Sequence, residues 1–366
     1  MVYLIKDIIT YLENLAPTAY QESYDNAGLI VGNAQAEVKG IICSLDVTEE
    51  VVQEAIEKKC NLIVAHHPII FGGLKQLTGK NYIERTVIAA IKNDIAIYAI
   101  HTNLDAVNQG VNRKIAEKIG LLNPQILAPK KGIVSKLTTF IPKGEEEDVL
   151  KELFEAGAGN IGNYSNCSFK SEGTGSFLPK EEAEPTIGEK GKLAFVEETR
   201  VELIFPSHLE YKIIQTLKKA HPYEEVAYYL QVLENKNQDV GSGMIGSLPE
   251  PMEGEDFLLY LKSSMNLKVL KHTKILNRKV EKIAICGGAG VFLLNHAKKS
   301  GADVFVTSDI KYHEFFDAEN SILLTDIGHY ESEIYTKELL KDILSRKFSN
   351  IATYLTNVIT NPISYL

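Results

Sequence analysis

Short apolar runs, each followed at once by polar side chains, recur along this chain and predict buried strands of a parallel sheet. One such run is Asn61–Ala65, and His66 and His67 follow it directly. Runs of this length without polar alternation are typical of strands covered on both faces. Open α/β sheets bind their ligands at the C-terminal ends of such strands, so we expect both histidines at a ligand site. A solvated loop with two incidental histidines would give the same local pattern.

Three further apolar runs end in the same way. The runs and the polar residues after them are Ile95–Ile100 with His101 and Asp105, Asp303–Val306 with Asp309, and Ser321–Thr325 with His329 and Glu333. A histidine and an acid four residues apart lie on one face if the chain turns helical there. Such strand ends, meeting in one crevice, would give a nitrogen- and oxygen-rich site without thiolate. That chemistry favours zinc, manganese, iron or magnesium in a hydrolytic role.

The two ends of the chain carry one pattern at a constant offset. Strands beginning at Val38 and Val280 correspond, as do His67 and Asp309, and both offsets are 242 residues (280 minus 38, and 309 minus 67). Chance similarity between two β-α-β units is common, so coincidence stays open as an alternative to a true repeat. A true repeat would pack its halves around one crevice. That packing would bring together His66, His67, Asp105, His329 and Glu333.

Helical periodicity fills the segments between these strands. The predicted helices are Lys6–Leu15, Glu49–Lys59, Asn81–Lys92, Gln109–Leu121, Val291–Ser300 and Glu333–Lys347. The last of these would place Glu333 in its first turn. Residues 287–290, Gly-Gly-Ala-Gly, lead into the fifth helix and indicate a tight turn, with a weaker signal for phosphate binding at a helix N-terminus.

Residues 130–235 differ in character from the segments on either side. Their pattern predicts strands at 130–140, 200–205 and 226–233 and helices at 144–155 and 207–220. A β-α-β arrangement that occurs twice is the ferredoxin-like pattern, so we expect an antiparallel sheet with both helices on one face. The polar residues 234–239 suit an exit linker. The expected fold is α/β, with two pseudo-repeated α/β halves (1–129 and 236–366) forming one core and an inserted ferredoxin-like α+β domain (130–235).

Composition narrows the class of protein. The 366 residues carry a formal net charge of −9, which argues against a broad nucleic-acid-binding surface. The four cysteines are scattered without a C-x-x-C pair, as expected of free thiols in a reducing compartment. No apolar run reaches the ~20 residues of a membrane span, and the first residues lack the pattern of a signal peptide. We therefore expect a cytoplasmic protein.

Six motifs in order along the chain resemble the Ngg-interacting-factor-three-like family, often labelled GTP cyclohydrolase type 2 homologue. They are Tyr24-Asp-Asn-Ala-Gly-Leu, Leu45-Asp-Val-Thr, Ala65-His-His-Pro, His101-Thr-Asn-Leu-Asp, Thr307-Ser-Asp-Ile-Lys-Tyr-His and Gly328-His-Tyr-Glu-Ser-Glu. Gly157-Ala-Gly-Asn-Ile-Gly-Asn-Tyr and His221-Pro-Tyr-Glu-Glu resemble the inserted domain of the longer bacterial members.

The resemblance implies a dinuclear divalent-metal site inside a ring-shaped homohexamer. Carried over position by position, the implied ligands are His66, His67, Asp105, His329 and Glu333. His101 and Asp309 fall beside these ligands rather than among them. The insert is implied to resemble the small trimeric signalling proteins of the nitrogen-regulation and copper-tolerance type.

Two hypotheses of function follow. The first is a hydrolase that uses two divalent ions per chain, zinc first, on a small nucleotide-like or phosphorylated substrate. In it, Asp46 or Asp309 would accept the proton, although helix capping explains Asp46 equally well. The second hypothesis is a non-enzymatic, oligomeric metal-binding or ligand-sensing protein. A cavity with room for a substrate would favour the first, and a coordinatively closed site the second.

Overall fold

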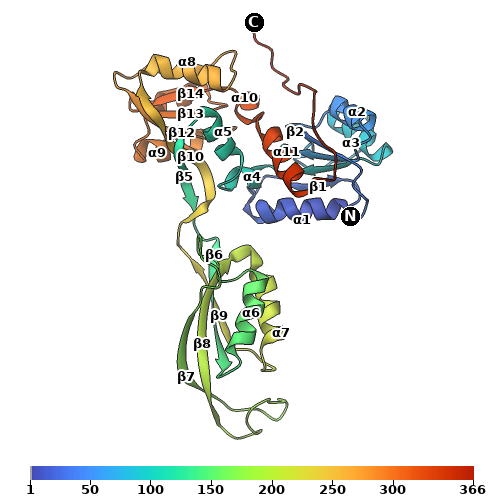
Figure 1. Ribbon diagram of the computed structural model, residues 1–366, viewed down its shortest axis with the longest axis vertical. Helices are drawn as coiled ribbons and strands as arrows, with labels where there is room; N and C mark the ends of the chain where they lie inside the picture. The colour runs from blue at the N-terminus through green and yellow to red at the C-terminus, as the bar shows by residue number, and fades with distance from the viewer. Residues whose placement is uncertain (1) are drawn as a thin grey trace. The chain divides into compact units, whose positions relative to one another are not determined.

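The computed structural model describes residues 2–366, apart from the side chain of residue 238, and forms two compact units. One unit contains the residues up to Pro129 and from Gln238 onward, and the other is Lys130–Asn237. Each unit has its own sheet structure, whose strands are labelled in Figure 1, and its own apolar core.

The first sheet of the larger unit has the strand order β1-β4-β3-β2-β15. Its strands are β1 (Gly28–Val31), β2 (Ile41–Ser44), β3 (Leu62–Ala65), β4 (Ala96–Ala99) and β15 (Thr353–Leu355). The last four run parallel and β1 runs antiparallel to β4. Because β2, β3 and β4 are buried at every position, their apolar runs show no alternation, as the sequence predicted.

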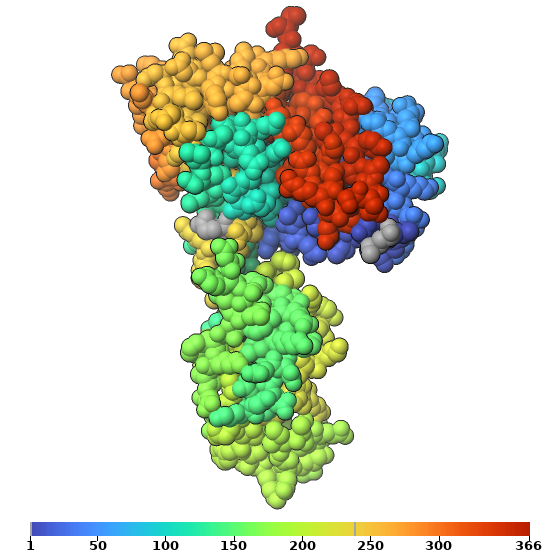
Figure 2. Space-filling view, viewed as in Figure 1, coloured from blue at the N-terminus to red at the C-terminus, as the bar shows by residue number. Residues whose placement is uncertain are grey.

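Helices on both sides of this sheet exclude water from it. They are α1 (Ile5–Leu15), α2 (Glu49–Glu57), α3 (Tyr82–Lys92) and α11 (Thr336–Lys347), with a short helix η1 (Thr18–Tyr20). Apolar residues of α2 and α3 share one buried cluster with β2, β3 and β4, while α11 contacts β2 and α5 (Val111–Ile119). Figure 2 shows the C-terminal residues, in red, packed against the blue N-terminal segments and the teal α5.

The second sheet of the same unit has the strand order β11-β14-β13-β12-β10-β5. Its strands are β5 (Leu122–Lys130), β10 (Asn237–Met252), β11 (Lys271–His272), β12 (Val280–Ile285), β13 (Val304–Thr307) and β14 (Leu323–Asp326). Its helices are α8 (Gly254–Ser264), η3 (Val291–Leu293), α9 (Leu294–Lys299) and η4 (Tyr312–Ala318). Strands β12, β13 and β14 run parallel, and α9 packs on them through Leu294 and Ala297.

The central strands of the two sheets pair in equivalent registers. Ile41 lies opposite Leu62 across β2 and β3, and Ile283 lies opposite Val304 across β12 and β13. Both members of the second pair stand 242 residues after their counterparts (283 minus 41, and 304 minus 62). The offset read from the sequence therefore recurs in the strand pairing.

The smaller unit is one antiparallel sheet with two helices on one face. Its order is β7-β8-β6-β9, and every strand pair in it is antiparallel. Its elements are β6 (Val134–Pro142), α6 (Glu146–Ala156), β7 (Phe169–Phe177), β8 (Ala194–Pro206), η2 (Ser207–Leu209), α7 (Glu210–Ala220) and β9 (Tyr228–Leu233). Residues of α6 and α7 share one buried cluster with alternate residues of β6 and β8, which puts both helices on the same face. The antiparallel sheet and the helix placement were both expected.

Several features differ from the sequence prediction. The predicted helix from Glu333 is two helices, α10 (His329–Glu333) and α11, so Glu333 ends a short helix instead of beginning a long one. Strand β7 was missed because its polar, glycine-containing sequence has little strand propensity, and pairing with β8 supplies its stability. Strand β5 was missed because it contains two prolines, which an edge strand tolerates. The second half of the predicted exit linker, residues 237–239, is the start of β10.

Within the described residues, no helix is both long enough and apolar enough to cross a membrane.

Candidate metal centre

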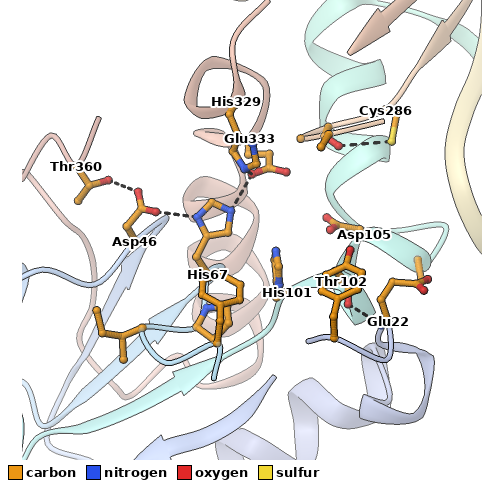
Figure 3. A pocket seen from close by; sticks show the side chains of 18 of the residues that line it. Glu22, Asp46, His67, His101, Thr102, Asp105, Cys286, His329, Glu333 and Thr360 are labelled. Carbon is orange, nitrogen blue, oxygen red and sulfur yellow. Dashed lines mark hydrogen bonds and ion pairs between the residues drawn. The ribbon is translucent and has the colours of Figure 1, made fainter. Parts of the chain in front are cut away.

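Three strand ends supply the five ligands that the family resemblance implied, together with His101. His66 and His67 follow β3 directly. His101 follows β4 and leads into the short helix α4 (Thr102–Ala106), which carries Asp105. His329 and Glu333 are the first and last residues of α10, which follows β14. Since β3 and β4 belong to one sheet and β14 to the other, the site lies where the two sheets of the larger unit meet (Figure 3).

Local backbone geometry fixes the helix that carries His329 and Glu333. Gly328 begins this turn with φ +90°, and a Cβ there would lie 2.3 Å from Glu331 Oε2. Only glycine fits this position without strain. The helix that follows places His329 and Glu333 four residues apart on one face, and His329 Nε2 lies 3.1 Å from Glu333 Oε2.

Behind each of four imidazoles stands an oxygen acceptor. The Nδ1 contacts are His66 to Ile100 O (2.9 Å), His67 to Asp46 Oδ1 (2.7 Å), His101 to Asp25 Oδ1 (2.8 Å) and His329 to Asp309 Oδ2 (2.7 Å). A carbonyl or an ionised carboxylate can only accept, so Nδ1 donates in each case. This pairing fixes each ring and leaves Nε2 as the nitrogen for a ligand. Metal-binding histidines are held in this way.

The carboxylate of Glu333 lies among three of these Nε2 atoms, those of His66, His67 and His329. Its Oε2 is 2.9 Å from His67 Nε2 and 4.0 Å from His66 Nε2, besides the contact with His329. Gly288, at φ +62°, makes room for it, because a Cβ there would lie 2.4 Å from Glu333 Oε1. The glycine turn at residues 287–290 therefore has a structural role at the site.

Two buried polar atoms of the site have no hydrogen-bond partner. They are His66 Nε2 and Asp105 Oδ1, and they face each other at 3.5 Å. Because Nδ1 of His66 donates to Ile100, Nε2 of the neutral ring is an acceptor, and so is an ionised Asp105. Two buried acceptors that face each other are unfavourable unless a cation or a proton lies between them. The residues present therefore fit a metal ion at this point.

The protonation states of the ion-free site reflect this crowding. Burial lowers the pKa of His66 to about 3. Burial alone would also lower the pKa of His67, but hydrogen bonds with Asp46 and Glu333 outweigh it and raise that pKa to about 10. Burial and the charge of Glu333 raise the pKa of Asp105 well above its usual range. Burial opposes ionisation of Glu333, but hydrogen bonds from His329 and His67 hold its pKa well below its usual range.

Three groups of side chains have ligand atoms close enough to hold an ion. They are His66, His67 and His101; His67, His329 and Glu333; and His66, Asp105 and Glu333. Within each group the ligand atoms lie within 4.8 Å of one another. The arrangement brings all five predicted ligands together and puts His101 among the candidate ligands, where the sequence expected it only beside them.

Around these groups is a cavity of about 920 Å³. His67, His101, Asp105, His329 and Glu333 line it, and loops from both sheets complete its wall. Its volume falls in the range of small-molecule sites in proteins, roughly 300–1,000 Å³.

Sequence reasoning missed two positions at the site. Asp25 was not singled out as a site residue, yet its carboxylate accepts from His101 and from the Thr102 backbone N–H. Burial alone would raise the pKa of Asp25, but hydrogen bonds from His101 and Thr102 lower it below its usual range. Thr360 donates to Asp46 Oδ2 at 2.6 Å from a C-terminal segment without sequence features of a site. For Asp25 a signal existed, since it stands in one of the six motifs, but Thr360 gave none.

Comparisons with known proteins identify the family of this chain. Residues 3–362 match the sequence model of the family described as Duf34/NIF3 (NGG1p interacting factor 3). A Bacillus subtilis (strain 168) protein named "GTP cyclohydrolase 1 type 2 homolog" is 38% identical over 367 residues, which cover 99% of this chain and 98% of that protein. Among solved structures, a Bacillus cereus protein related to NIF3 has a TM-score of 0.86 at 39% identity, with both chains fully covered. The Staphylococcus aureus protein SA1388 has a TM-score of 0.80 at 33% identity, with 100% of this chain and 99% of that chain covered. The chain thus belongs to the Duf34/NIF3 family.

Proposed function

We propose that this protein binds two divalent metal ions per chain and is a metal-dependent hydrolase of a small nucleotide-like or phosphorylated molecule. The proposed ligands are His66, His67, Asp105, His329 and Glu333. The observation that carries the proposal is the facing pair of buried acceptors, His66 Nε2 and Asp105 Oδ1, which no protein donor satisfies among the described residues.

Sharing of Glu333 supports two ions instead of one. Glu333 belongs to the group with His67 and His329 and also to the group with His66 and Asp105. One carboxylate common to two ligand groups is the arrangement expected of a dinuclear site. Imidazole and carboxylate ligands suit zinc first, with manganese and iron next and magnesium least, since magnesium prefers oxygen ligands and retained water.

Bound divalent ions would lower the pKa of a coordinated water and polarise the bond that it attacks. The chain's own residues prepare the site for that chemistry. Asp46 and Asp309 each accept from the Nδ1 of a proposed ligand histidine, which supports an orienting role for both. The sequence suggested that Asp46 or Asp309 accepts the proton. In this arrangement either aspartate could do so only on the Nδ1 side of its histidine, away from Nε2.

A non-enzymatic role in metal binding or ligand sensing is the second candidate. It would be favoured by a closed site with no room beside the ligands. The cavity of about 920 Å³ next to the histidines favours the hydrolase.

We further propose that the two sheets of the larger unit form a pseudo-repeat and that residues 130–235 form an inserted ferredoxin-like domain. The shared register offset of 242 residues supports the repeat. The β-α-β-β-α-β connectivity of the smaller unit supports the inserted domain.

Elemental analysis of protein purified without chelator tests the metal proposal. We expect about two divalent ions per chain, and none in the double variant His66→Ala with His329→Ala, which should keep its circular-dichroism spectrum. The matched control is His272→Ala with His296→Ala, which removes two exposed histidines that do not line the cavity. A wild-type protein without tightly bound metal would contradict the proposal. A double variant that fails to fold would make the site structural instead of catalytic.

A further inference from the structure

Four large aromatic side chains line the cavity and remain more than half exposed. They are Tyr24 (69%), Phe71 (54%), Tyr82 (57%) and Phe292 (65%). Tyr24, Phe71 and Tyr82 come from segments around the first sheet, and Phe292 comes from η3 of the second. Exposed apolar surface gathered at a cavity is costly in water and typical of a ligand-binding surface.

The ring of Phe71 also connects this aromatic set to the proposed metal site. It meets the His101 imidazole edge to face, with ring centroids 5.8 Å apart. His101 in turn lies beside His66 and His67, with centroid distances of 5.1 and 5.2 Å. A ligand that contacts Phe71 is therefore close to the groups proposed to hold the ions.

The charged side chains that line the cavity are mostly acidic. Four carboxylates line it, those of Glu22, Asp46, Asp105 and Glu333, and within the described part of the chain no lysine or arginine does. Sites that hold phosphate groups commonly use arginine, lysine or a helix N-terminus. Two divalent ions would do little more than balance the four carboxylates, so a chain of phosphates would find no excess positive charge there.

Building on the proposed function, we propose that the cavity takes a planar, uncharged nitrogen heterocycle of the nucleobase type. The ring is held on its faces by Phe71 and Phe292, with Tyr24 and Tyr82 beside them. Stacking on aromatic side chains suits any flat heterocycle and requires no charge on the ligand. Two substrate classes were proposed above, nucleotide-like and phosphorylated molecules. The aromatic lining favours the nucleotide-like class, because it would bind the base, and it gives the phosphate groups no binding site.

Isothermal titration of the metal-containing protein tests this selection. The probes are guanosine and adenosine, which present a ring without phosphate, and inorganic tripolyphosphate, which presents phosphate without a ring. We expect both nucleosides to bind at least tenfold more tightly than tripolyphosphate. Tripolyphosphate binding as tight as the nucleosides, or tighter, would overturn the proposal.

Substitutions of the aromatic residues test where the base of the nucleoside binds. Phe71→Leu and Phe292→Leu should each weaken nucleoside binding about tenfold, which matches the loss of one stacking contact. The matched control is Phe316→Leu, because Phe316 is similarly exposed (66%) but does not line the cavity, and it should bind nucleosides as the wild type does. Unchanged nucleoside affinity in both cavity variants would overturn the proposal. It would do so even if Phe292→Leu lowered the oligomer mass, a result that would identify the Phe292 side chain as a subunit contact.

Elemental analysis of the same samples separates this inference from the proposed function. All three variants should keep the wild-type metal content, because none of the substituted residues is a proposed ligand. A protein that holds metal but binds no nucleoside would overturn the ring assignment alone. A protein without metal would overturn the proposed function, while the nucleoside titrations would still decide whether the aromatic set binds a ring.

Discussion

Each proposed ligand histidine of the candidate site is oriented by an oxygen acceptor behind it. Asp46 shows this most fully, because it accepts from His67 Nδ1 through one oxygen and from Thr360 through the other. Asp309 likewise accepts a hydrogen bond from His329 Nδ1. Its backbone has φ +55°, a left-handed conformation that aspartate tolerates better than most residues. These contacts set the direction of Nε2 and raise the basicity of the ring.

We expect Asp46→Asn and Asp309→Asn to weaken metal affinity by roughly 10- to 100-fold, because the amide no longer supplies a charged acceptor at Nδ1. Competition with a metal-binding dye measures the affinity. Asp303→Asn is the matched control, since Asp303 contacts backbone N–H groups of β12 and does not line the cavity. If Asp46→Asn instead keeps its metal and loses hydrolysis, the residue accepts a proton.

The raised histidine pKa values predict how the ion-free protein responds to pH. Hydrogen bonds to carboxylates outweigh burial and raise the pKa of His67 to about 10 and that of His329 to about 9, from an ordinary value of 6.5. A histidine with a raised folded pKa stabilises the fold fully below its unfolded value and loses that contribution as pH rises through the folded value. The melting temperature of chelator-treated protein should therefore fall between about pH 7 and pH 10.

Differential scanning fluorimetry across this range measures the effect. Metal-containing protein should show a smaller fall, since metal binding displaces these protons. The double variant His66→Ala with His329→Ala should lose only part of the slope, because His67 stays in place. An ion-free melting temperature that rises from pH 7 to pH 10 would contradict the assignment.

At the scale of elements, the strand ends carry the site and the smaller unit carries none of its ligands. The chain leaves the second sheet at the end of β5 and returns at the start of β10, and these two strands are neighbours in that sheet. A Cβ at Gly241 in β10 would lie 2.8 Å from Pro129 Cα, so the two strands run close together at this point.

We expect a chain in which Asn-Gly replaces residues 130–237 to fold and to bind about two metal ions, because a two-residue hairpin turn can join neighbouring antiparallel strands. Elemental analysis and circular dichroism measure the outcome. The same deletion with His66→Ala is the control that should lose metal. An insoluble or metal-free product would mean that the smaller unit is needed for the core.

At the scale of the whole molecule, the family resemblance predicts a homohexameric ring. Many large apolar side chains away from the cavity remain exposed on the described chain, Tyr211 and Tyr312 among them, and such surface is commonly covered in an assembly. Closed symmetry is the rule for soluble homo-oligomers. An enclosed cavity would also shield the metal site and admit only small molecules.

Light scattering at micromolar concentration should give about six times the chain mass of 40.6 kDa. The double variant His66→Ala with His329→Ala should keep this mass, because the assembly is not proposed to depend on metal. A monodisperse monomer or dimer would contradict the predicted ring and would not bear on the proposed dinuclear site.

Several features of this protein follow from the sequence alone. Fully buried strands such as β3 and β4 read as unbroken apolar runs, and the polar residues after them mark the site. The four-residue spacing of His329 and Glu333 indicated one shared face if the chain turns helical there, and α10 meets that condition. These features are local, since they depend on the period of a strand or a helix, so the printed order of residues is enough to recognise them.

Only the tertiary structure decided which groups meet. Glu333 reaches His67 across 266 residues of chain, and Thr360 reaches Asp46 across 314. The unsatisfied pair of His66 Nε2 and Asp105 Oδ1, and the aromatic lining from two sheets, arise in the same way. No period in the sequence encodes such contacts, because they depend on how two separately formed sheets pack and on which polar atoms that packing removes from water.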